Sequence, residues 1–137
     1  MGHSGLGTLV LLLMLFRLGW RATHEPPGAL ATMGVWQVKA SKAMHWTLYG
    51  LIILQPILGI CQAMFITEYQ VVAFGVIDYS ALAAADAEKA KIFHILHGLN
   101  ATVLSVLVIG HIGASLYHHF VQKDNVLRRM IPFGKPK

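Results

Sequence analysis

The sequence predicts an all-α protein, a transmembrane helical bundle of three spans, and two observations support this fold class. The chain of 137 residues is 55% apolar and only 12% charged, with a mean hydropathy of +0.58, whereas a soluble domain carries about 25% charged residues. In addition, the apolar residues gather in three runs. Each run is long enough to cross a hydrocarbon core of about 30 Å, which takes roughly 20 helical residues.

The three runs are expected to cross the membrane at residues 2–21, 43–66 and 90–121, and a basic tail follows at 122–137. Lipid cannot satisfy backbone hydrogen bonds, so each run is expected to be α-helical. The length fits one domain. Residues 1–137 are therefore interpreted as a single membrane-embedded domain.

Charged residues outside the runs predict how the chain is oriented. Basic residues outnumber acidic ones between the first two runs and again in the tail, whereas the connection between the second and third runs contains four acids, with Lys89 and Lys91 only where the third run begins. Lys and Arg favour the cytoplasmic side. The first connection and the C-terminus are therefore expected in the cytoplasm, and the acidic connection on the outer side.

Composition also excludes several classes of protein. The one cysteine, Cys61, rules out an intrachain disulfide and a zinc–cysteine cluster. The formal net charge of +5 comes from residues that flank apolar runs, which is typical of membrane orientation and not of a nucleic-acid partner. No pattern typical of hydrolases, P-loop proteins or dinucleotide-binding proteins is visible.

Histidine in the third run is the main functional signal, because histidine within a membrane span is rare and usually functional. His97 and His111 are 14 residues apart, so they differ by about 40° in azimuth on a helix and by about 21 Å along its axis. One face therefore offers an imidazole near each membrane surface. Two haem irons stacked across a bilayer require that arrangement. His118 shares this face and competes with His111 for the inner position.

An axial ligand on one helix needs a partner on another. His3 opens the first run among small residues and is the natural outer partner of His97. His45 opens the second run on the inner side and is one candidate partner for His111. Arg17 lies 14 residues after His3, on the same face, where a guanidinium can pair with an inner haem propionate. The remaining histidines near the ends of the runs are interpreted as interfacial polar residues: His24, His94, His118 and His119.

Three stretches carry a more specific pattern. The third run has His97 and GHIGASLYHHF (110–120), followed by KDNVLRRMIP (123–132). The second has HWTLYGLIILQPILG (45–59), and the first has His3 and FRLGWR (16–21). Together they resemble the bacterial cytochrome b561 family, whose members are small membrane cytochromes with four helices and two haems. The similarity covers nearly the whole chain.

The resemblance implies haem b, and therefore iron, at two sites. His3 and His97 match the ligands of the outer haem, and His111 matches one ligand of the inner haem. The family's other inner ligand lies on a first helix that has no counterpart among the three runs. A truncated gene model is the favoured explanation. A ligand from a separate chain, or His45 or His118 in its place, are the alternatives.

The resemblance implies an oxidoreductase of the bacterial inner membrane that exchanges electrons between the membrane quinone pool and a periplasmic donor. Superoxide is one such donor, and Lys89 and Lys91 are candidates to attract an anion. His45, Trp46 and Tyr49 are candidate contacts for quinone or a propionate. A haem-bearing anchor subunit for a separate dehydrogenase is the main alternative. A divalent-metal transporter is less favoured, since the runs contain no carboxylate. A homodimer stays open as an assembly state.

Overall fold

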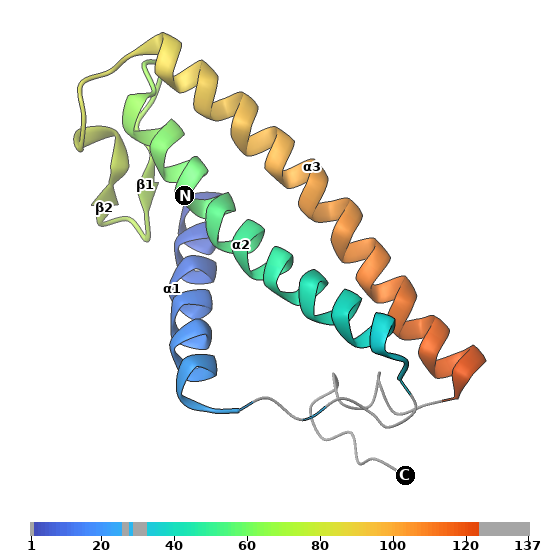
Figure 1. The fold of residues 1–137 in the computed structure, drawn as a ribbon. Coiled ribbons are helices and arrows are strands. Elements are labelled where there is room, and N and C mark those ends of the chain that lie inside the picture. Colours follow the sequence, from blue (N-terminus) through green and yellow to red (C-terminus); the bar gives the residue numbers. More distant parts are fainter. Residues whose placement is uncertain (1, 26–27, 29–32, 124–137) are drawn as a thin grey trace.

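The computed structural model describes residues 2–25, 28 and 33–123, and three long helices dominate that part of the chain (Figure 1). These are α1 (Gly2–Thr23), α2 (Val35–Phe65) and α3 (Ala87–Tyr117), and a π-helical turn, His118–Gln122, continues α3. Each helix is long and apolar enough to cross a membrane. The predicted fold class is therefore confirmed.

The helices extend beyond the expected crossing segments. α2 begins at Val35, well before residue 43, and the side chain of Gln37 accepts a hydrogen bond from the Gly34 N–H at 2.9 Å. This contact satisfies a donor at the helix start and lets the helix begin early. The expected third crossing, 90–121, lies within α3 and the π-turn. The basic residues expected after Lys123 lie outside the described residues.

α2 is the central helix and packs against both α1 and α3. α3 runs antiparallel beside α2, and α1 approaches α2 most closely near the N-terminus of the chain and diverges from it further down (Figure 1). We call the end that carries the connection between α2 and α3 the loop end, and the end where α1 stops and α2 starts the tail end. Apolar side chains point outward along the helices, as with Ile109, which is 70% exposed. Lipid is as apolar as leucine, so this exposure suits a membrane protein.

The connection at the loop end folds against α1 and α2. It contains a short antiparallel hairpin, β1 (Val72–Ala73) and β2 (Ile77–Asp78), and a 3₁₀ turn, Tyr79–Ala81. Buried Ala63, Ala73 and Tyr79 form a small core there. The Ser4 hydroxyl donates to the Val72 carbonyl oxygen at 3.0 Å. The start of α1 is therefore held by the connection.

α3 begins at a well-capped position. The Asp86 carboxylate accepts a hydrogen bond from the Lys89 N–H at 3.1 Å, and its second oxygen lies 2.9 Å from the Lys89 ammonium. The Asp86 N–H donates to the carbonyl oxygen of Phe65, the last residue of α2, at 3.0 Å. This cap fixes where α3 starts relative to α2, and thereby the height of the histidines that α3 carries.

Candidate functional site

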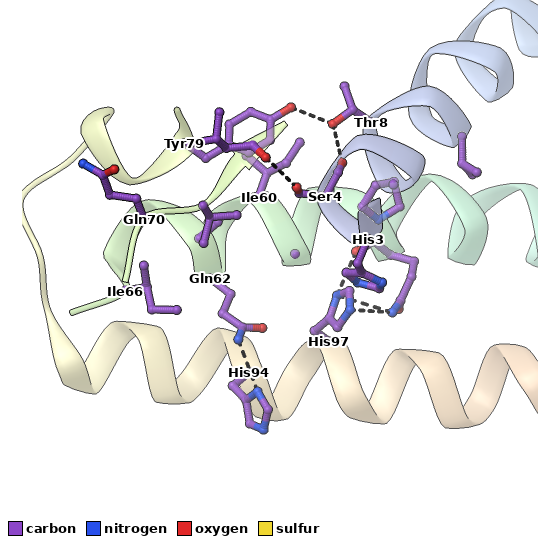
Figure 2. A pocket seen from close by; sticks show the side chains of 18 of the residues that line it. His3, Ser4, Thr8, Ile60, Gln62, Ile66, Gln70, Tyr79, His94 and His97 are labelled. Atoms are coloured by element: carbon purple, nitrogen blue, oxygen red, sulfur yellow. Dashed lines mark hydrogen bonds between the residues drawn. The ribbon is translucent and has the colours of Figure 1, made fainter. Parts of the chain in front are cut away.

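His3 and His97 face each other at the loop end, although 93 residues separate them in the sequence. Their ring centroids lie 6.1 Å apart, and the rings are nearly perpendicular, at 83°. His3 comes from the first turn of α1 and is exposed, whereas His97 comes from α3 and is half-buried. Figure 2 shows the two rings directed toward one another from their separate helices.

A cavity of about 750 Å³ lies beside this pair, within the range of roughly 300–1,000 Å³ that is usual for cofactor and small-molecule sites. Its walls come from α1, α2, α3 and the connection at the loop end. Apolar side chains and two glycines, Gly7 and Gly59, line much of it, and Gln62, Gln70 and His94 add polar groups. Ser4, Thr8 and Tyr79 also line the cavity, so its walls are apolar over much of their surface and polar in places, as is usual for cofactor sites.

The spacing of the His3–His97 pair fits a bound metal. Imidazole nitrogens bind a first-row transition metal at about 2.0–2.1 Å, so two imidazoles on opposite sides of one ion have ring centroids roughly 6 Å apart. The observed 6.1 Å agrees with that spacing. Two such ligands beside a cavity of this size are the donor set that a bis-histidine haem requires.

His97 is held on the side that faces α2. Its Nδ1 lies 3.0 Å from the carbonyl oxygen of Gln55, and its Nε2 lies 3.0 Å from the side-chain nitrogen of the same residue. Gly59 lies directly against the ring, because a Cβ at that position would be 3.1 Å from the ring carbon Cε1. A residue larger than glycine would therefore push the ring away.

Buried Asn100 continues this network one turn along α3. Its side-chain NH₂ donates to the Gln55 side-chain oxygen at 2.6 Å and to the Leu51 carbonyl oxygen at 3.1 Å. Asn100 is only 8% exposed. A buried polar group is costly unless it is hydrogen-bonded. Sliding α3 along α2 would break both bonds of Asn100, so these contacts favour one register between the two helices.

A second histidine pair lies toward the tail end. The ring centroids of His45, from α2, and His111, from α3, are 5.3 Å apart at an angle of 73°. α3 runs without interruption from His97 to His111. One rigid helix therefore supplies one member of each pair.

Two arginines of α1 lie over an aromatic surface of α2 near this second pair. The Arg17 Nε–H donates to the Tyr49 hydroxyl at 2.9 Å, and the Arg21 guanidinium carbon lies 5.2 Å from the Trp46 ring centroid. Both arginines are close enough to His45 for charge–charge interaction. In the part of the chain that the structure describes, no carboxylate forms an ion pair with either arginine. The arrangement suits an anionic group such as a carboxylate.

The residues singled out from the sequence are thus gathered in two places. His3 and His97 are brought together, and so are His45 and His111, with Arg17 nearby. His118 lies in the π-turn with its ring edge-on to Tyr117. His94 contacts Gln62 and lines the cavity.

The two lysines expected to attract an anion differ in their surroundings. The Lys89 ammonium lies 2.9 Å from Asp86 and 5.2 Å from the Phe65 ring centroid, so its charge is paired. Lys91 is exposed and makes no ion pair within the described residues.

Sequence reasoning missed four residues of these sites: Gln55, Gly59, Asn100 and Arg21. Gln55 and Asn100 did carry a signal, since both are amides inside otherwise apolar runs, where an unpaired polar group is costly. Gly59 carried no such signal in the sequence, because the need for a glycine there depends on which residue of α3 lies opposite.

Comparison with known proteins identifies a matching family and several relatives. Residues 2–133 match the family described as prokaryotic cytochrome b561. The chain is 32% identical to cytochrome b561 homolog 1 of Escherichia coli (strain K12), a match that covers 97% of this chain and 74% of the relative.

Two further relatives are similar over most of the chain. One is the probable superoxide oxidase CybB of Yersinia pestis, which is 33% identical over 95% of this chain and 73% of the relative. The other is cytochrome b561 homolog 2 of Escherichia coli (strain K12), which is 30% identical over 94% of this chain and 68% of the relative.

Proposed function

This chain belongs to the prokaryotic cytochrome b561 family, and we propose that it is a haem b protein of the bacterial inner membrane that passes electrons between a periplasmic donor and membrane quinone. The family implies haem b, and a multi-pass membrane protein is what the three apolar helices form. The observation that carries the proposal is the His3–His97 pair beside a cavity of cofactor size.

We assign the outer haem to the loop end. His3 and His97 would hold its iron, and the apolar parts of the cavity wall would keep water away from it. When bound, iron held by two imidazoles exchanges single electrons between its ferric and ferrous forms and keeps no open position for oxygen or substrate. The residues of the loop end therefore serve electron transfer and not hydrolysis or oxygen binding.

We assign the inner haem to the tail end, with His111 as one ligand. His45 is the candidate for the second ligand within this chain, because its ring lies 5.3 Å from that of His111. Arg17, which lies near His45, is suited to hold a haem propionate by charge and hydrogen bonding. On this assignment the tail end, and with it the C-terminus, faces the cytoplasm.

We propose superoxide as the periplasmic donor, as the name of the Yersinia relative, probable superoxide oxidase, suggests for that protein. Two superoxide anions, each giving up one electron and becoming oxygen, supply the two electrons that, with two protons, convert one quinone to quinol. Lys91 is the exposed cation available near the start of α3 to favour the approach of an anion.

The ligand assignment is tested by haem content and spectrum. Purified protein from haem-replete cells is expected to show a b-type α-band on reduction. His97→Ala and His3→Ala are each expected to remove the outer haem in a pyridine haemochrome assay. His24→Ala is the matched control, since the His24 ring stacks on Trp20 of α1, with 3.8 Å between the ring centroids, and is not among the residues that line the cavity. Full haem content in His97→Ala would overturn the assignment.

The donor and acceptor are tested in proteoliposomes that contain a quinone. Enzymatically generated superoxide is expected to reduce the haem, and quinol is expected to accumulate at one molecule for every two superoxide anions consumed. Superoxide dismutase added outside the vesicles is the control and should abolish the reaction. Reduction that persists in its presence would exclude superoxide as the donor.

A further inference from the structure

We propose that Asn100, Gln55 and Gly59 position the outer ligand His97, by fixing the hydrogen on its Nδ1 and the lone pair on its Nε2, the nitrogen on which iron would take the place of the Gln55 NH₂ group. This inference rests on the proposed function, in which His97 is an axial ligand. It concerns three residues that do not touch the metal, and each acts through the imidazole.

The hydrogen-bond partners of the ring determine which nitrogen carries the hydrogen. Nδ1 lies 3.0 Å from the backbone carbonyl oxygen of Gln55. A carbonyl oxygen can only accept, so Nδ1 is the donor. A neutral imidazole has one N–H, and Nε2 therefore carries a lone pair. This is the tautomer that binds a metal through Nε2.

The side chain of Gln55 agrees with the same assignment. Asn100 donates to the Gln55 side-chain oxygen at 2.6 Å, which turns the Gln55 NH₂ group toward His97, where it lies 3.0 Å from Nε2. An NH₂ group can only donate, so it agrees with a lone pair on Nε2, and iron bound to that nitrogen would displace it. Asn100 is itself fixed by the Leu51 carbonyl oxygen at 3.1 Å. The same Gln55 nitrogen also lies 3.3 Å from Nδ1, which is the longer of its two contacts with the ring (Figure 2 shows the bonds at His97).

Gly59 gives the ring access to this carbonyl oxygen. A Cβ at position 59 would lie 3.1 Å from Cε1 and 3.3 Å from Nδ1 of His97. These distances are tighter than ordinary contacts between carbon atoms of about 3.5–4.0 Å. With alanine there, the ring must move away from α2, and the Nδ1–H bond to the Gln55 carbonyl oxygen must lengthen.

The contacts of Gln55, Asn100 and Gly59 around His97 have a measurable consequence for this ligand. An imidazole that donates its other N–H to a carbonyl oxygen is more basic. A more basic ligand stabilises ferric iron over ferrous iron, because the ferric ion has the higher charge. Loss of the network is therefore expected to raise the midpoint potential of the outer haem and to weaken its binding.

The test uses the full-length haem-loaded protein in detergent. Gly59→Ala and Asn100→Leu are each compared with the wild type for the midpoint potential of the outer haem, by spectroelectrochemical titration, and for the rate of haem transfer to a scavenging apoprotein. Both variants are expected to show a more positive potential and faster haem loss, by roughly 10- to 100-fold, the usual effect of removing a partner of a ligating histidine.

Matched controls separate positioning from general disturbance. Gly50→Ala lies on the same helix as Gly59, but a Cβ there meets nothing within 4 Å. Thr102→Val removes a hydroxyl of α3 that bonds only the Gly98 carbonyl oxygen of its own helix. Both controls are expected to match the wild type.

The outcomes also distinguish this inference from the proposed function. If His97→Ala removes the outer haem while Gly59→Ala and Asn100→Leu behave as their controls, the positioning role is wrong and the ligand assignment stands. If His97→Ala keeps its haem, the ligand assignment itself fails. Should Gly59→Ala assemble no haem, the potential measured for Asn100→Leu decides.

Discussion

The hydroxyl groups of Thr8 and Tyr79 lie 2.8 Å apart and join α1 to the connection at the loop end, across 71 residues of sequence. The Thr8 hydroxyl hydrogen is donated to the Ser4 carbonyl oxygen at 2.8 Å, so the Tyr79 hydroxyl is the donor. Tyr79 is only 7% exposed. This bond, with that from Ser4 to Val72, holds the helix turn that carries His3.

A double-mutant cycle measures that bond. Thr8→Val and Tyr79→Phe are each expected to lower the free energy of unfolding, and the double variant to lose less than the sum of the two. The coupling energy is expected to be about 0.5–1.5 kcal/mol, the net contribution of one such hydrogen bond. Denaturant titration in detergent micelles gives the four free energies. Strictly additive losses would mean that the two hydroxyls do not stabilise one another.

Haem stoichiometry decides which residue completes the inner site. If His45 is the partner of His111, both His45→Ala and His111→Ala lower the haem-to-chain ratio by the same amount, because a haem with one axial ligand is retained poorly. His118→Ala is then expected to keep the wild-type ratio. Pyridine haemochrome assays on the purified variants measure this. A reduced ratio in His118→Ala and an unchanged one in His45→Ala would assign the site to His118.

The charges of Arg17 and Arg21 are expected to raise the potential of the inner haem, since a nearby cation disfavours the more positive ferric iron. Arg17→Gln and Arg21→Gln should each lower the midpoint potential of the inner haem. The expected change corresponds to a free energy of reduction on the order of 1 kcal/mol per electron, the effect of one unit charge roughly 10 Å away at an effective dielectric constant near 20. Spectroelectrochemical titration measures both haems at once. The outer potential should stay constant, and so should both potentials in Lys39→Gln, a control on the exposed start of α2.

Lys91 is expected to speed the approach of superoxide. Lys91→Gln should slow haem reduction and weaken its dependence on ionic strength, because one attracting charge is removed. Stopped-flow reduction at several salt concentrations provides the measurement. The double variant Asp86→Asn with Lys89→Gln is the control, since it removes an ion pair and leaves the net charge unchanged. If Lys91→Gln reacts like this control, the lysine serves only to orient the chain in the membrane.

Much of the architecture follows from length and periodicity. Three apolar runs of sufficient length fix three helices, since lipid permits little else. The 14-residue interval between His97 and His111 places both on one face whatever the tertiary packing is. His3 could be paired with His97 because the two lie at the same membrane surface in the expected topology. These conclusions depend on one helix, or on one surface, at a time.

What the sequence could not provide depends on register between helices. The contact of Gly59 with His97 requires α2 and α3 to meet at one particular height, which the Asp86 cap and the Asn100 bonds set. The hairpin at the loop end was also not predicted, because strands of two residues are too short to show alternation. Arg21 was not distinguished from other basic residues near a membrane surface until its place over Trp46 was known.

The unbroken course of α3 has a further effect on how this molecule can be controlled. His97 and His111 are 14 positions apart on one unbroken helix, so about 21 Å along its axis separates the two imidazoles that α3 supplies. A rearrangement of the surrounding segments would therefore not change the distance between the imidazoles of His97 and His111. On the proposed function, the rate of electron transfer in either direction would then depend on the midpoint potentials of the two haems and on how readily the donor and acceptor bind.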